Sequence, residues 1–111
     1  MEPHPGVFVS TTSTDDWVSD QEVPGSVMHE LVHADGVHAG MTRFTDVDEP
    51  ITWTPERREV AIILEGSVRI EITDGGTFDL GVGSLFSIPP GLETTWHIST
   101  PFKEMWVLAS D

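Results

Sequence analysis

The segment EVAIILEGSVRIEITDGG, residues 59–76, decides the fold class of this chain. Its first part is an aliphatic run, residues 60–64, closed by Glu-Gly, which predicts a strand buried on both faces. The following SVRIEIT alternates apolar and polar residues, and this period of two predicts a half-buried strand. Asp-Gly-Gly at 74–76 tolerates positive φ, so we expect a hairpin turn there.

The flanking sequence repeats this pattern of short strands and turns. Downstream, TFDLGVG alternates again, SLFSIPPGLETTWHIS contains a strand, a Pro-Pro-Gly turn and a second strand, and EMWVLAS supplies a last strand. Upstream, VHAGMTRF reads as a strand, whereas SVMHELVHA suits a strand or a turn of amphipathic helix, and we favour the strand. Strands spaced by about 8 to 12 residues predict an all-β sandwich or closed barrel.

Length and composition fit one domain of this kind. The chain has 111 residues, and its 10 Gly and 8 Pro suit a fold with many turns. We interpret residues 1–26 as an N-terminal arm, with Phe8 and Trp17 as its anchors if it docks, and residues 27–111 as the barrel domain. The chain has no Cys, which excludes disulfides, thiolate metal sites and thiol nucleophiles.

The charge balance limits the partners. Nineteen acidic and five basic residues give a formal net charge of −14, which repels phosphate backbones and anionic membrane surfaces. We therefore expect neither nucleic acid nor a membrane as a partner. The N-terminal sequence lacks the basic start and apolar stretch of a secretory signal, so a cytoplasmic protein is expected.

Two spaced motifs lie within the predicted strands. Six residues separate Glu59 from Gly66, five separate Gly83 from Pro89, and Gly91 follows two positions later. These spacings resemble the cupin family, in which His-x-His, three or four residues, Glu, six residues and Gly precede Gly, five residues, Pro-x-Gly, two residues and His. The resemblance implies a cupin-type jelly-roll β-barrel of two packed antiparallel sheets.

The stretches PPGLETTW and PFKEMWVL narrow this resemblance. They are similar to the small single-domain cupins related to ureidoglycine aminohydrolase and the ethanolamine-utilisation proteins, which often carry Thr-Trp after the Pro-x-Gly turn. The likeness runs from about Val37 to Leu108. It implies a fold and no particular reaction, because one fold hosts many chemistries.

The metal ligands that the resemblance implies do not match. Counting back from Glu59, the positions of the His-x-His pair are occupied by Thr52 and Thr54, or by Trp53 and Pro55. Thr94 stands at the position of the second-motif His. Of three His and one Glu only Glu59 remains, and one carboxylate does not hold a transition metal without help. We expect no cofactor and no metal at the motif positions, while a transition metal held by other residues stays open.

The histidines offer one competing pattern. HELVH, residues 29–33, fits the His-Glu-x-x-His sequence of zinc peptidases, which requires a helix to place both His on one face. Pro24-Gly25 upstream and two glycines downstream argue against a helix, so we interpret these His as surface or structural residues. A weaker alternative is a metalloenzyme whose rearranged ligands come from Glu59 and from His29, His33, His38 and His97.

The candidate site follows from positions that the motifs bring together. Glu59 opens a strand whose next five residues are apolar, which places a carboxylate at the barrel mouth, either facing a substrate or paired with Arg57 or Arg58. Thr94 and Trp96 share one strand face, where the indole could stack on a ligand or fill the core. We predict Glu59 as catalytic, and Thr94, Trp96 and Trp53 as ligand-binding.

The functional hypothesis is a cupin-domain protein of unassigned reaction that binds a small metabolite in the barrel mouth. If burial raises the pKa of Glu59, that residue could perform metal-independent acid–base chemistry such as isomerisation or elimination. The alternative is a non-catalytic module that senses a metabolite or packs with a partner, so the sequence leaves enzyme status open. A homodimer is also expected, from the apolar arm and the frequency of twofold oligomers.

Overall fold

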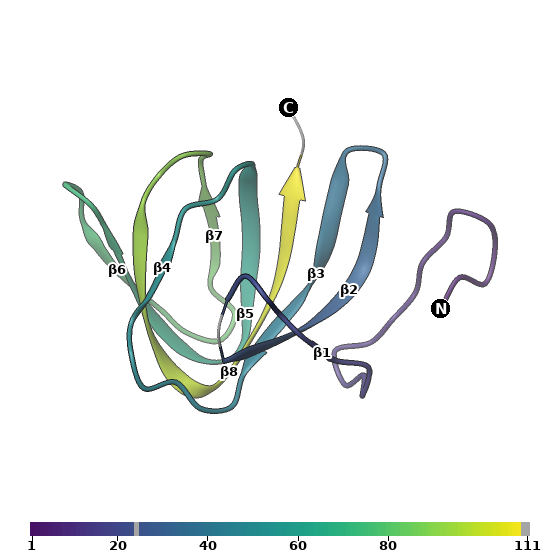
Figure 1. Cartoon of the computed structure of the whole chain (residues 1–111), viewed down its shortest axis with the longest axis horizontal. Coiled ribbons are helices and arrows are strands. Elements are labelled where there is room, and N and C mark those ends of the chain that lie inside the picture. Colours follow the sequence, from purple (N-terminus) through teal and green to yellow (C-terminus); the bar gives the residue numbers. More distant parts are fainter. Residues whose placement is uncertain (24, 110–111) are drawn as a thin grey trace.

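The computed structural model describes residues 1–23 and 25–109, and this part of the chain is built from strands and turns. It contains no helix, and hence none long and apolar enough to cross a membrane. Figure 1 labels its strands. They are β1 (Val18–Ser19), β2 (Ser26–Ala34), β3 (Val37–Phe44), β4 (Ile51–Trp53), β5 (Arg58–Ile72), β6 (Thr77–Leu80), β7 (Leu85–Ile88) and β8 (Thr94–Ala109).

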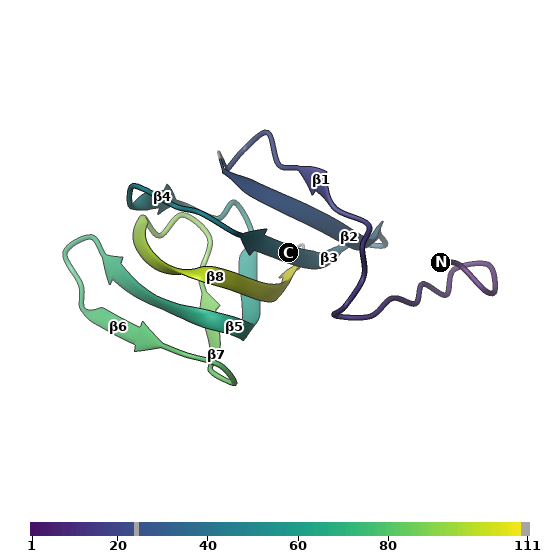
Figure 2. The same cartoon turned by 90° about the horizontal axis from the view of Figure 1, so that it is seen from below.

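The two long strands, β5 and β8, run through both halves of an antiparallel sheet. Its order is β1-β2-β3-β8-β5-β6, with β4 pairing with β8 and β7 with β5. β3 pairs with the second half of β8, and β4 with the first residues of that strand. In Figure 1 the long strands curve between β2 and β3 on one side and β4 and β6 on the other, and Figure 2 shows the same fold from below. The predicted all-β jelly roll is confirmed, although its hydrogen-bonded path is open, ending at β1 and β6.

The sheet bends at Gly66, where β5 meets the middle of β8. The register between the two strands shifts on both sides of Glu65, and Gly66 has a φ of 80°. A Cβ at Gly66 would overlap the carbonyl oxygen of Pro101 and lie 2.8 Å from that of Ser99. Glycine is required here because the conformation is left-handed and the neighbouring backbone leaves no room for a side chain.

Two details of the predicted strands were wrong. Glu-Gly at 65–66 bends β5 instead of ending it, and the two strands predicted around Pro101 form one continuous β8. The run in β5 is not buried on both faces either, because Ala61 and Ile63 are buried whereas Val60 is 45% exposed. The physical reason is that only the inner face of each half-sheet packs against the other half. The preference for a strand in SVMHELVHA is confirmed as β2.

The core lies between the two halves of the sheet. The long strands supply most of its members, and Ile63 and Phe102 are completely buried. Their inward positions follow the two-residue period of each strand, as the alternation in SVRIEIT predicts. The buried cluster consists of Phe44, Ile63, Val68, Ile70, Ile88, Trp96 and Phe102.

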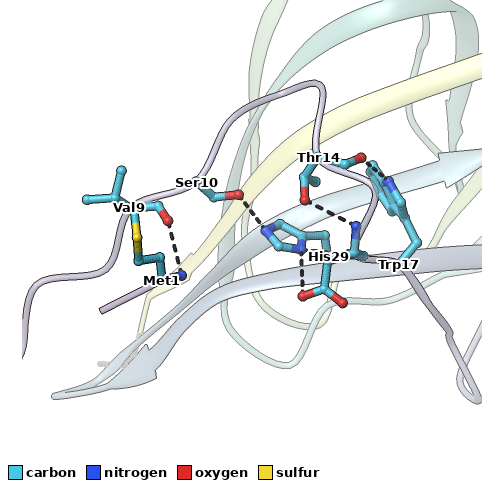
Figure 3. A network of polar contacts seen from close by, with 7 residues as sticks. Met1, Val9, Ser10, Thr14, Trp17 and His29 are labelled. Carbon is cyan, nitrogen blue, oxygen red and sulfur yellow. Dashed lines mark hydrogen bonds and ion pairs between the residues drawn. The ribbon is translucent and has the colours of Figure 1, made fainter. Parts of the chain in front are cut away.

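The second part of the arm is tied to the outer face of the sheet. His29 Nδ1 donates to the carbonyl of Asp16 at 2.7 Å, and its Nε2 is hydrogen-bonded to the Ser10 hydroxyl at 2.7 Å (Figure 3). Trp17 donates to the Thr14 carbonyl, and its ring lies 4.5 Å from the Arg43 guanidinium carbon. Trp17 therefore anchors the arm as expected, and β1 follows it as an edge strand on β2.

The tip of the arm, residues 1–9, bonds mainly to itself. Met1 and Val9 exchange hydrogen bonds between their backbones, and the tip projects away from the sheet (Figure 2). Phe8 is 38% exposed and belongs to no core cluster, so it does not anchor the arm as predicted. The side-chain hydrogen bonds that tie the arm to the sheet begin at Ser10, beyond Phe8.

Gly66→Ala should lower the free energy of unfolding by more than about 3 kcal/mol, because the left-handed φ alone costs about 1–2 kcal/mol and the overlap with Pro101 adds to it. Gly83→Ala is the matched control, since Gly83 has a φ of 88° and no atom of the described residues lies within 4 Å of an added Cβ. Urea denaturation of both variants measures the difference. Equal losses would show that the close approach at the corner contributes nothing.

The homodimer stays a prediction. Apolar side chains that could contribute to its interface are exposed at the arm tip and on β5 and β7, namely Val7, Phe8, Val9, Val60 and Leu85. Light scattering should give twice the 12.2 kDa chain mass. Removing residues 1–9 should weaken the association if the tip contributes, whereas a monomer mass throughout the micromolar range would contradict the dimer.

Candidate functional site

A cavity of about 650 Å³ opens at the mouth between the two halves of the sheet. Its wall combines aromatic surface with a few groups that titrate. The aromatic residues come from β3, β4 and β8. The titratable residues come from β2, β3, β5 and β8 and from the loops before β2 and β5, which supply Asp20, Glu22, Glu56 and Arg57. The main lining residues are Phe44, Trp53, Trp96, Trp106, Glu59, Glu104, His33 and His38. This mixture is typical of a small-molecule site.

Alternation along the long strands directs these side chains inward. On β8, Trp96 and Ile98 from the first half and Glu104, Trp106 and Leu108 from the second half line the cavity. On β5, Glu59 lies opposite Leu108 in the register. Positions separated by more than 30 residues in sequence therefore share one wall because β5 and β8 are neighbours along their whole length.

Glu59 is 3% exposed and its partner is a tryptophan. Trp53 Nε1 donates to Glu59 Oε1 at 2.7 Å. Burial raises the pKa of Glu59, and the hydrogen bond from Trp53 opposes that rise in part. The alternative ion pair with an arginine is not formed, because Arg58 bonds to Ser87 at 2.8 Å and no Glu59–Arg57 pair occurs among the described residues.

Glu104 is the second acid in the cavity, and it was not predicted from the sequence. The residue is 6% exposed, and its Oε2 is buried without a hydrogen-bond partner in the described chain. Burial, followed by the charge of Glu59, raises the pKa of Glu104 well above its usual range. Burial and a neighbouring like charge both disfavour the ionised form of a carboxyl group, so Glu104 is the acid of the two that most favours its proton. The available signal was its position between the inward-facing Phe102 and Trp106.

Thr94 lies beneath the cavity wall. Its hydroxyl donates to the Trp53 carbonyl and accepts a hydrogen bond from Trp96 Nε1 at 2.9 Å. Thr94 is 2% exposed and does not line the cavity, whereas Trp53, Trp96 and Glu59 do. Trp96 also belongs to the core cluster, so it serves packing and the cavity wall together. The catalytic role of Glu59 and the ligand-binding roles of Thr94, Trp96 and Trp53 stay predictions.

An all-β jelly roll with a cavity between the two halves of its bent sheet is the fold of the cupins. Residues 39–105 match the EutQ-like cupin domain, and the chain belongs to this family. A comparison with curated proteins finds no match.

Solved structures agree on the fold. The chain is similar to an RmlC-like cupin from Shewanella frigidimarina, with 17% identity, a TM-score of 0.74 and coverage of 92% of this chain and 89% of that one. The chain is also similar to KdgF from Halomonas sp., with 17% identity, a TM-score of 0.73 and coverage of 94% of both chains. The EutQ protein from Clostridium difficile is similar with 21% identity and a TM-score of 0.62, and the match covers 77% of this chain and 62% of that one. At these identities the likeness extends to the fold alone.

The metal site typical of cupins does not fit the residues at its positions. Thr94 stands in place of a histidine, and its hydroxyl is fully used between the Trp53 carbonyl and the Trp96 indole. Glu59 is bound by Trp53. Hydroxyl and indole groups offer no imidazole nitrogen, and a single carboxylate is too small a donor set for a transition metal. No chemistry of this protein is derived from a metal at that position.

Glu104→Gln should make the stability of the protein less dependent on pH. A carboxyl whose pKa is raised by folding costs nothing below the unfolded value of about 4.3, and the protein loses stability as pH rises from there toward the folded pKa. Urea denaturation between about pH 4 and pH 8 should therefore show a smaller loss for Glu104→Gln than for the wild type. Glu93→Gln, at an exposed position, is the control and should follow the wild type. Parallel curves for wild type and Glu104→Gln would contradict the raised pKa.

Proposed function

We propose that this cupin binds a small metabolite in its mouth cavity and transfers a proton with Glu59 and Glu104. The observation that carries the proposal is the buried Oε2 of Glu104, which has no hydrogen-bond partner among the described residues, while Glu104 lines a cavity that Glu59 also lines. Buried polar groups in proteins are normally satisfied, so an unpaired carboxyl oxygen in a cavity is a good candidate for a ligand contact.

The chemistry suited to these two acids is metal-independent proton transfer. In a pair that holds one proton, the ionised carboxylate can accept a proton from carbon while the protonated acid donates one to an oxygen or carbon of the same ligand. An isomerisation of this kind is redox-neutral. The two acids return to their starting charge when the first gives its new proton to another carbon of the ligand and the second takes back the proton that it donated. An elimination would need the same two groups, one for the proton and one for the leaving oxygen.

The aromatic wall indicates the shape of ligand that would fit. Trp53, Trp96 and Trp106 line the same cavity, and indole faces favour planar or cationic groups. Apolar walls also lower the local dielectric around the acids, which strengthens their effect on a bound ligand. We therefore expect a small ligand with one planar face and a polar group directed to the acids.

A non-catalytic sensing module is the second candidate. It is favoured by the hydrogen bond from Trp53, which gives Glu59 a structural partner in the free protein. In such a module the cavity would still bind a metabolite, and the two acids would serve recognition alone. The two candidates differ in whether a proton leaves the ligand.

Glu59→Gln should strongly slow proton exchange while retaining ligand binding. The measurement is NMR detection of deuterium uptake from D₂O by a panel of small hydroxy-acids, oxo-acids and sugars, with binding followed by ligand-observed NMR. General acid–base groups contribute about 10²–10⁴-fold, so exchange should fall by at least about 100-fold in Glu59→Gln and in Glu104→Gln. Glu71→Gln, exposed on the same strand, is the control. A panel member that binds the wild type in the cavity without any exchange would overturn the acid–base role in favour of sensing.

A further inference from the structure

We propose that Glu30, His33 and His38 form a binding site for a divalent transition-metal ion of the zinc type at the rim of the cavity. One ligand atom from each of the three residues lies within 4.8 Å of the other two. His38 Nε2 is 2.9 Å from Glu30 Oε2, and the rings of His33 and His38 are stacked with their centroids 4.1 Å apart. The site is separate from the motif positions, and it does not depend on the proton transfer proposed for Glu59 and Glu104.

The β2–β3 hairpin places the two histidines opposite one another. Asp35 and Gly36 have φ values of 53° and 79°, as a tight two-residue turn requires. His33 is then the direct cross-strand partner of His38. Side chains of directly opposed residues lie on the same face of a sheet, so the turn itself brings two imidazoles together.

A β-bulge brings Glu30 to the same face. Residues three positions apart on a regular strand point to opposite faces, so Glu30 and His33 would be separated. The register shifts between Glu30 and Val32, which inserts one extra residue and restores Glu30 to the face of His33. Gly40, the partner of Glu30, permits this close approach, since a Cβ there would overlap the carbonyl oxygen of His29.

The surroundings hold one ligand rigid and leave the site accessible. The His38 and Trp106 rings pack edge to face with their centroids 4.9 Å apart. Because Trp106 Nε1 donates to the Thr42 hydroxyl at 2.8 Å, the imidazole packs against an indole that is held in place. The Glu30 side chain is half exposed, and both histidines also line the cavity. Two imidazole nitrogens and a carboxylate oxygen suit Zn²⁺, and the open side leaves a coordination position for water or a cavity ligand.

The other histidine of HELVH is excluded from this site. His29 lies on the outer face, where both ring nitrogens are engaged by the arm residues Ser10 and Asp16 (Figure 3). The site therefore does not reproduce the zinc-peptidase pattern, which needs both of its histidines on one metal. It also differs from the rearranged set considered in the sequence analysis, because Glu30 replaces Glu59 as the carboxylate.

The test is titration of the untagged full chain, freed of metal by a chelator, with Zn²⁺ by calorimetry and with Co²⁺ by absorption spectroscopy. We expect one ion per chain in the micromolar range and a Co²⁺ visible band of a low-coordinate site. Loss of one ligand in His33→Ala or His38→Ala should reduce affinity on the order of 100-fold, since even outer-sphere partners are worth about 10–100-fold.

Matched variants separate the site from general effects. His97→Ala removes a histidine that is paired with Glu71 at 2.9 Å on another part of the sheet, so Zn²⁺ affinity should be unchanged. Glu30→Gln changes a half-exposed side chain without loss of the fold, and it should weaken binding and alter the Co²⁺ band. The proposal would be overturned if the wild type bound no stoichiometric Zn²⁺. It would also be overturned if His33→Ala, His38→Ala and Glu30→Gln left Zn²⁺ affinity unchanged. Neither result bears on deuterium exchange by Glu59.

Discussion

The close approach of Gly66 to the Pro101 carbonyl is the contact on which the rest of the structure depends. It lets β5 and β8 bend together without losing their pairing, so one hydrogen-bonded sheet supplies both layers. The inner faces on either side of the bend then enclose Ile63 and Phe102. A side chain at Gly66 would force the strands apart at the point where the core and the cavity wall meet.

The bend also explains why two carboxyl groups occupy one cavity. Glu59 and Glu104 lie on neighbouring strands, on the face that the bend turns inward, and burial opposes the charged form of both. Trp53 satisfies one of them, and Thr94 with Trp96 occupies the space beside it. At the positions where the family motif has histidines, this chain therefore has an indole and hydroxyl network beside two buried carboxyl groups.

Local irregularities in the backbone decide which polar residues meet. In the β2–β3 hairpin a bulge and a tight turn gather Glu30, His33 and His38, whereas the same strand turns His29 toward the arm. The arm in turn covers that outer face through Trp17 and Arg43. In a regular strand His29 and His33, four positions apart, would share one face, and the bulge between them places them on different surfaces.

The sequence by itself determined the fold class, because the alternation in SVRIEIT, the turn at 74–76 and the motif spacings are local features that survive without knowledge of partners. It also identified Glu59, Trp53 and Trp96, which reach the cavity. Only the tertiary structure decided that β5 continues through Gly66, that Thr94 lies beneath the wall, and that Glu104 joins Glu59. Those outcomes depend on contacts between residues far apart in the chain and on single-residue register shifts, and neither is encoded in the period of one strand.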